Sequence, residues 1–210
     1  MLLTRIRCAT FAAAGLFITG GTASAHHLMG GKTPSTFAEG ILSGIGHPVI
    51  GPDHLAFLAA LGIAVGVSRV SFVNPFVFLV AMACGVAAHV AAVNIPAAEF
   101  IVAVSVLLAG VLLALDRRIP ATGWMAIFAA AGFFHGYAYG ESIYGAEATP
   151  LIAYLMGLVV VQTALVVGIA FATRSVWTAS SLAPRLVGAA ISGVGFAVLV
   201  AQFIPSGVFI

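Results

Sequence analysis

Two imidazoles and a carboxylate lie within eight residues of one long apolar segment, in the stretch GHPVIGPDH from Gly46 to His54. His47, Asp53 and His54 offer two borderline nitrogen ligands and one oxygen ligand, a set suited to Ni, Co, Zn or Cu. An Asp at the centre of a membrane helix costs roughly 3 kcal/mol even on a lenient insertion scale, so it indicates a functional partner. We interpret these residues as the strongest candidate metal site. The alternative is that Asp53 caps a helix resuming after Pro52 and that His47 hydrogen-bonds a loop carbonyl.

A second polar group lies in FFHGYAYGES, from Phe133 to Ser142. His135 and Tyr139 are one helical turn apart, so they share a face of the expected helix. We expect His135 to join the metal site, with a neighbouring hydroxyl or carbonyl that satisfies its imidazole as the alternative. Glu141 closes the segment near the outer surface, where it is either a ligand or a solvated carboxylate. The glycines of this segment recur every four residues and allow close helix packing.

The other histidines are weaker candidates for metal ligands. His89 lies toward the outward end of the next apolar segment and is either an extension of the site or an interface histidine. His26 and His27 would open a processed chain and either bind metal through imidazoles and the new α-amine or form a flexible tail. Two apolar segments each contain one glutamine, Gln162 and Gln202, and we expect both to hydrogen-bond across helices.

Composition places these residues in a membrane. Of the 210 residues, 62% are hydrophobic and 7% are charged, whereas soluble domains carry about 25% charged residues. The mean hydropathy is +1.18. The apolar runs are continuous, which favours transmembrane helices over the alternating strands of a β-barrel. The eight Lys and Arg residues form no basic patch, which excludes nucleic-acid binding. The sequence therefore predicts an all-α integral membrane protein.

The first 25 residues have the layout of a secretory signal peptide. Arg5 and Arg7 form a basic region, Cys8–Gly20 is apolar, and Ala23-Ser24-Ala25 is a small-residue cleavage site. The alternative is an uncleaved first transmembrane helix. Cleavage predicts a mature chain, residues 26–210, that forms one transmembrane bundle domain.

About six transmembrane helices are expected after the signal peptide, since roughly 20 apolar residues span a bilayer. Basic residues fall in alternate loops, with Lys32 as the one exception, and the positive-inside rule then places both mature termini outside. The protein is thus expected to be multi-pass in the bacterial inner membrane, with periplasmic termini. The six expected spans are Phe37–Val67, Asn74–Val93, Ala97–Leu115, Gly123–Gly140, Pro150–Thr173 and Pro184–Ile204.

The first span is expected to be broken or strongly kinked at GHPVIGPDH. Pro48 and Pro52 each remove a backbone donor, and Phe37–Val67 is longer than one straight crossing needs. Spans one and four each open one half of a three-plus-three arrangement, and an odd number of spans per half makes the halves inverted. Motif-bearing helices at matching positions of inverted halves indicate a transporter's central site. The loops are too short for a catalytic domain, and no Walker, HExxH or GxSxG motif is present, so we expect no enzyme.

The motifs HPVIGPDH and FHGYAYGE resemble the two signatures of the HupE/UreJ family, and the resemblance extends over essentially the whole chain. These proteins are bacterial secondary permeases for nickel, found with hydrogenase and urease systems, and some relatives are linked to cobalt. The resemblance implies that His47, Asp53, His54, His135 and Glu141 matter for transport. Many members carry a histidine at the place of Tyr139, and the loss of that imidazole implies an altered metal preference.

The sequence and the resemblance together predict uptake of a divalent transition metal, most simply nickel, with cobalt or copper as alternatives. The metal would be cargo, and no permanently bound cofactor is expected. Expected partners are the lipid bilayer and the metal ion, with a homo-oligomer or a larger uptake system compatible with the pattern. A different class stays open: a metal-binding assembly subunit, metallochaperone or metalloenzyme that does not transport alone.

Overall fold

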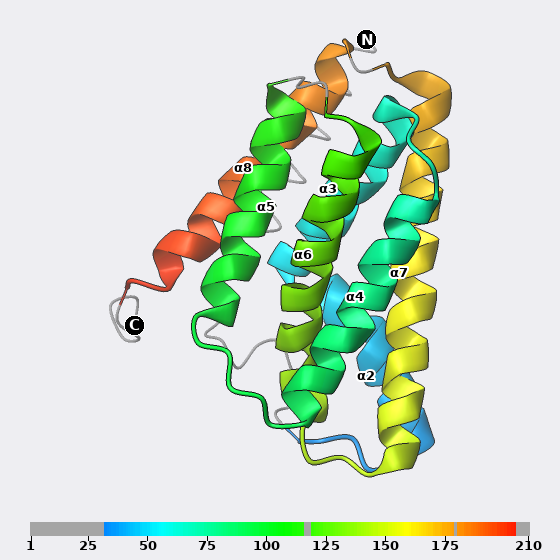
Figure 1. The fold of residues 1–210 in the computed structure, drawn as a ribbon, viewed down its shortest axis with the longest axis vertical. Coiled ribbons are helices and arrows are strands. Elements are labelled where there is room, and N and C mark those ends of the chain that lie inside the picture. Colours follow the sequence, from blue (N-terminus) through cyan, green and yellow to red (C-terminus); the bar gives the residue numbers. More distant parts are fainter. Residues whose placement is uncertain (1–31, 116–118, 179, 205–210) are drawn as a thin grey trace, which may run out of the picture.

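The computed structural model describes residues 32–115, 119–178 and 180–204, and within these ranges the fold is all-helical, with no strand. The helices lie side by side in a bundle (Figure 1). They are α2 (Phe37–Ile50), α3 (Pro52–Ser68), α4 (Val73–Val90), α5 (Ala98–Ala114), α6 (Ala121–Gly140), the short 3-10 helix η2 (Glu141–Ile143), α7 (Ala148–Val176) and α8 (Leu182–Ala201). The expected signal peptide, with His26 and His27, lies outside the described residues.

The first predicted span is two helices, as expected. A capping box starts α2: the hydroxyl of Thr36 accepts from the backbone N–H of Glu39, and the Glu39 carboxylate accepts from the N–H of Thr36. Gly51 ends α2 in an extended conformation, and Pro52 stands at the first position of α3, where its missing N–H costs nothing. The two helices are bent by 77° at this break. Pro48 is accommodated inside α2.

Close glycine contacts define the direction in which the helices pair. Along α2 and α7, Gly40 lies against Pro150 and Gly44 against Tyr154, so the numbers rise together and the helices run parallel. The α4–α6 pair is also parallel, with Phe78 and Met82 meeting successive glycines of α6. In the α5–α8 pair the order reverses, since Gly110 lies against Ser192 and Gly195 against Leu107.

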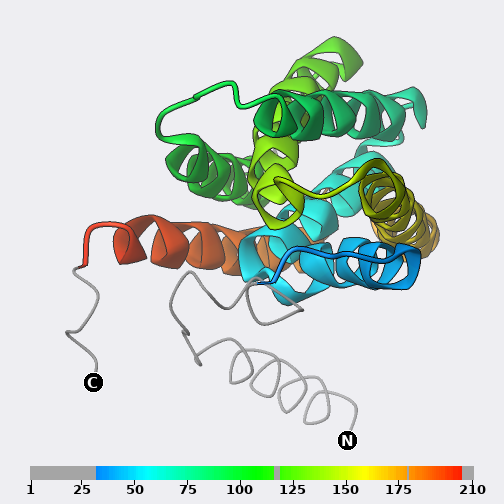
Figure 2. The ribbon, with the colours of Figure 1, turned by 90° about the horizontal axis from the view of Figure 1, so that it is seen from below.

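The pairing pattern agrees with an inverted three-plus-three arrangement. The dominant helix pairs are α4 with α6, α5 with α8, and α2 and α3 with α7, and Figure 2 shows α2 alongside α7 and α4 beside α6. The first half comprises α2 to α5, and the second comprises α6 to α8. When each helix is replaced by its counterpart in the other half, the α4–α6 pair becomes the α7–α2 pair, and the α5–α8 pair becomes itself in reverse order. The parallel and antiparallel directions are those that six alternating crossings require.

Helix length and hydropathy identify the chain as a multi-pass membrane protein. Among the described residues, α4, α7 and α8 are each long and apolar enough to cross a bilayer, and the bent pair α2–α3 passes as a fourth span. The apolar helix α5 is shorter, at 17 residues, and α6 carries the polar FHGYAYG segment. The count of six crossings and their orientation stay predictions. Large apolar side chains point outward, as helices in lipid require: Phe76, Val160, Phe171, Leu186 and Phe196.

We expect Gly44→Ala to weaken the α2–α7 contact. An added Cβ would meet the backbone carbonyl of Tyr154, which cannot move away as a flexible side chain would. Overpacking of this kind costs about 1–3 kcal/mol, so the thermal unfolding midpoint of the purified protein in detergent should fall. Gly168→Ala on α7 is the matched control, because its Cβ would meet nothing within 4 Å. Equal melting of the two variants would contradict this packing.

Candidate metal site

Three histidines from three helices meet in the interior of the bundle, next to the break between α2 and α3. His47 from α2, His54 from α3 and His135 from α6 are 4%, 4% and 1% exposed. The ring centroids of His47 and His54 are 5.5 Å apart, and those of His54 and His135 are 5.0 Å apart. The two separate sequence motifs therefore form one buried histidine cluster, defined as His47, His54 and His135.

The cluster lies where two aromatic cores meet. On one side the ring of Phe57 is 4.5 Å from that of His135, within a core that also holds Trp124 and Phe128. On the other side Tyr139 belongs to a core with Tyr154 and Met82. This setting excludes bulk water on both sides, so polar contacts inside it are stronger than at a surface.

Hydrogen bonds tie each imidazole to another helix. The Nδ1 atom of His47 lies 2.9 Å from the hydroxyl of Tyr154 on α7, and that hydroxyl donates to the Tyr139 carbonyl at 2.8 Å. The Nδ1 atoms of His54 and His135 are 2.9 Å apart. The Nε2 atom of His135 lies 2.9 Å from the hydroxyl of Ser105 on α5. A neighbouring hydroxyl thus contacts His135, as the alternative for this residue anticipated.

Tyr139 packs against two histidines of the cluster. Its ring centroid is 4.3 Å from that of His54 and 5.0 Å from that of His47, and the residue is 0% exposed. Its hydroxyl is buried without a hydrogen-bond partner among the described residues. Tyr139 therefore lies inside the site, where its hydroxyl is a polar atom available to a ligand.

Asp53 stands beside the cluster at the start of α3. Its Oδ1 accepts a hydrogen bond of 2.8 Å from the backbone N–H of His54, so the side chain does satisfy one helix-terminal donor. The residue is partly buried, and its carboxylate is close enough to His135 and Tyr139 to act on both electrostatically. The capping alternative thus accounts for one hydrogen bond of Asp53, and the hydroxyl of Tyr154 is one partner of His47.

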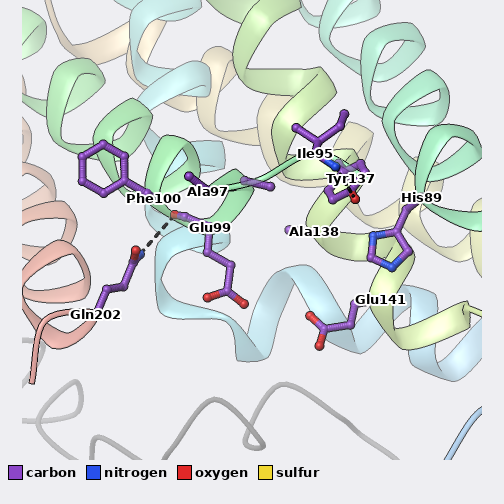
Figure 3. Close-up of a pocket in the computed structure, with 10 residues that line it drawn as sticks. His89, Ile95, Ala97, Glu99, Phe100, Tyr137, Ala138, Glu141 and Gln202 are labelled. Carbon is purple, nitrogen blue, oxygen red and sulfur yellow. Dashed lines mark hydrogen bonds between the residues drawn. The ribbon is translucent and has the colours of Figure 1, made fainter. Parts of the chain in front are cut away.

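His89 and Glu141 lie in a different place, a recess of about 310 Å³. It is called the outer recess after the side on which the predicted orientation places it. Its polar lining residues are His89, Glu99, Tyr137, Glu141 and Gln202. Figure 3 shows the imidazole of His89 and the carboxylates of Glu99 and Glu141 directed into this recess. The ring of His89 lies 4.6 Å from that of Tyr137, and its Nδ1 is buried without a hydrogen-bond partner in the described structure. None of the cluster histidines lines this recess.

The two glutamines behave differently. Gln202 donates to the backbone carbonyl of Glu99 at 3.1 Å, as expected for a residue that bridges helices. Gln162 is 0% exposed, yet neither its amide nitrogen nor its oxygen has a hydrogen-bond partner among the described residues. The expectation of an interhelical hydrogen bond is therefore wrong for Gln162.

Across the described ranges, no three His, Cys, Asp or Glu side chains are arranged so that they could hold a metal ion together. Imidazoles, hydroxyls and the carbonyl of Tyr139 lie at hydrogen-bond distance from one another in and around the histidine cluster. The carboxylates of Glu99 and Glu141 line the recess, which none of the cluster histidines lines. The predicted ligand set, His47, Asp53, His54, His135, Glu141, His89, His26 and His27, stays a prediction.

Sequence reasoning missed Ser105, Tyr154 and Glu99. Ser105 is the one hydroxyl residue inside the apolar helix α5, and Tyr154 the one polar aromatic in the first half of α7. A single polar residue in a membrane helix was the available signal. It could not be placed, because a helix that is apolar on all sides does not reveal which face is buried.

Comparison with known proteins identifies the family. The model of the HupE / UreJ protein family matches residues 14–198. Protein HupE from Rhizobium leguminosarum bv. viciae is 28% identical over 166 residues, which cover 78% of this chain and 86% of that relative. No solved structure matches the chain. Both motifs that meet in the histidine cluster lie inside the matched region. The chain belongs to the HupE/UreJ family.

Proposed function

We propose that this protein is a secondary permease that takes up a divalent transition metal, nickel first, across the bacterial inner membrane. The observation that carries the proposal is the buried histidine cluster beside a broken membrane helix. Ionisable groups inside a membrane protein mark ion pathways by default, and interrupted helices at a repeat interface are where secondary transporters bind their substrates. Membership of a family of nickel and cobalt transporters supports the same function.

The substrate ion would pass from the outer recess to the histidine cluster. Carboxylates of the recess attract a hydrated divalent cation electrostatically. Neutral imidazoles of His47 and His54, with the charge of Asp53, then replace part of its hydration shell. The bend at Gly51 gives α2 and α3 a junction about which one half of the bundle rocks against the other, and this motion would open the cluster inward.

Uptake into proteoliposomes of the purified protein tests the proposal. Nickel, cobalt, copper and zinc are offered in parallel, and empty liposomes serve as the control. A permease accumulates at least one metal without any other protein. Tight binding of a metal without accumulation would instead identify an assembly subunit or a metallochaperone.

Tyr139 is expected to influence which metal is preferred. Tyr139→His would place a third nitrogen ligand against His47 and His54, and added nitrogen donors favour nickel and copper over harder ions. We expect the uptake ratio of nickel to cobalt to rise by about tenfold in parallel proteoliposome assays. Tyr137→His, two residues earlier and on the recess side of α6, adds the same imidazole outside the cluster, so the comparison separates an effect of the cluster from an effect of a nitrogen ligand elsewhere on the path. Equal ratios in wild type and Tyr139→His would show that this position does not set metal preference.

A further inference from the structure

Gln162, in the middle of α7, is buried without a polar partner. The residue is 0% exposed, and neither its amide oxygen Oε1 nor its amide nitrogen Nε2 has a hydrogen-bond partner among the described residues. No other side chain in the described ranges has two buried polar atoms in this state. An unpaired amide in an apolar interior lowers stability, and an apolar side chain of similar size would avoid the loss. Packing therefore does not explain the amide.

Gln162 lies between the two aromatic cores that meet at the histidine cluster. One helical turn before it, Leu158 belongs to the core that holds Tyr139. One turn after it, Val166 belongs to the core that holds Phe57. Residues four apart on a helix share a face, so Gln162 points into the bundle interior at the boundary between the cores.

The packing of α7 against α3 sets Gln162 close to the helix break. Gly62 of α3 lies against Val166 of α7, and the next close contact, one turn further along both helices, shows that they run in the same direction. One turn earlier, the same register sets Gln162 opposite Leu58, which is one turn after His54. Long side chains lean toward the N-terminus of their helix. In α7 that is the direction of the cluster, since the α7 tyrosine that hydrogen-bonds the cluster lies two turns before Gln162.

We propose that Gln162 is a further binding residue for the transported divalent cation, with its Oε1 accepting a hydrogen bond from a water molecule that the cation retains at the histidine cluster. The inference rests on the proposed permease function and deepens it in one respect. It adds α7, which carries none of the predicted metal ligands, to the helices that hold the substrate.

The chemistry of a metal-bound water favours an amide oxygen at this position. The water oxygen is committed to the cation, so the water can only donate, and charge-assisted hydrogen bonds of this kind are strong in a site without bulk water. An amide oxygen accepts such a bond without adding a negative charge. The ion is therefore held but not trapped, which a transport site requires because the ion must also leave. The unpartnered hydroxyl of Tyr139 is a second acceptor beside the cluster.

Nickel binding by the full chain in detergent tests the inference, with nickel chloride as the probe and calorimetry as the measurement. Binding that persists in His54→Gln lies outside the cluster and is subtracted. Gln162→Leu removes the acceptor, and loss of an outer-shell contact costs about 10–100-fold in metal affinity, so the Kd for nickel should rise by that factor. Gln162→Glu keeps an oxygen acceptor at the same place and should bind nickel at least as tightly as the wild type.

Thermal stability without nickel separates this role from a structural one. Because the amide has no partner in the described bundle, Gln162→Leu should melt at or above the wild-type midpoint although it binds nickel more weakly. Thr173→Val is the matched control. It also replaces a buried polar side chain of α7 by an apolar one, and the Thr173 hydroxyl donates to carbonyls of its own helix. This control should keep the wild-type Kd.

Two results would overturn the inference. One is a wild-type Kd for nickel in Gln162→Leu, and the other is a midpoint of that variant well below the wild type, which would assign the amide to the fold. Uptake by proteoliposomes separates the inference from the permease proposal, since the KM for nickel should rise together with the Kd in Gln162→Leu. A wild type that binds nickel at the cluster but accumulates none would refute the permease, while weaker binding by Gln162→Leu would still identify Gln162 as a metal-binding residue.

Discussion

Asp53→Asn is expected to abolish nickel uptake while the protein reaches the membrane in its normal amount. The substitution removes the negative charge beside the histidine cluster but retains an oxygen that can accept the His54 N–H, as Asp53 does at 2.8 Å. Losing one partner of a close, desolvated charge pair costs about 2–5 kcal/mol. Uptake should therefore fall by roughly two orders of magnitude or more, measured as the initial rate of nickel accumulation in proteoliposomes.

Glu147→Gln is the matched control for Asp53→Asn. It also neutralises one carboxylate, but Glu147 is exposed at the start of α7 and makes no side-chain cap. Its uptake should equal that of the wild type, and the thermal midpoints of both variants should match. If Asp53→Asn transports at the wild-type rate, the carboxylate serves only the helix start and has no role with the ion.

The helices were predictable because a membrane helix corresponds to a long apolar run in the sequence, with polar residues, glycine or proline between one run and the next. The expected span Asn74–Val93 corresponds to α4, Val73–Val90, and the break expected near Pro52 occurs at Gly51. Proline chemistry is local, so it can be interpreted without a tertiary structure. The approach of His135 to His54 also followed from sequence, because both are costly to leave in lipid and must find polar partners.

His135 and Tyr139 of the second motif lie at the histidine cluster, whereas Glu141 lies in the outer recess. This division could not be predicted from their spacing alone. His135 and Tyr139 share a face of α6, as their four-residue spacing requires. Glu141 comes two residues after Tyr139, which is a rotation of about 200° on a helix, and it lies past the end of α6 in η2. Gly140 packs against the ring of His89, so the end of the motif borders the outer recess and not the cluster.

Contacts between the site residues and side chains of other helices were the hardest feature to predict from the sequence. Nothing in the apolar pattern of α7 shows that Tyr154 faces His47, since residues on every side of this helix are apolar. The register that brings them together depends on Gly44 and Gly157, whose missing side chains allow α2 and α7 to approach closely. Such contacts depend on three-dimensional packing, which a single sequence does not specify.

Replacement of a cluster histidine should have a far larger effect than replacement of the recess histidine. His54→Gln removes an imidazole at the point where all three cluster residues and Tyr139 meet. Because an amide is a poor ligand for a transition metal, nickel uptake should fall to the background of empty liposomes at any nickel concentration. His89→Gln changes a residue of the outer recess, which would affect capture of the ion and not its passage.

The two variants are therefore distinguished by how uptake depends on nickel concentration. For His89→Gln we expect a KM raised by up to about tenfold and a maximal rate close to that of the wild type, since loss of a binding contact outside the central site weakens ground-state binding alone. Abundance in the membrane, measured by immunoblot, should be equal for both. A maximal rate lost in His89→Gln as completely as in His54→Gln would mean that the recess and the cluster act as one site. The ion would then have to contact both regions before the bundle rearranges, and the separation of His89 from the other histidines would not hold during transport.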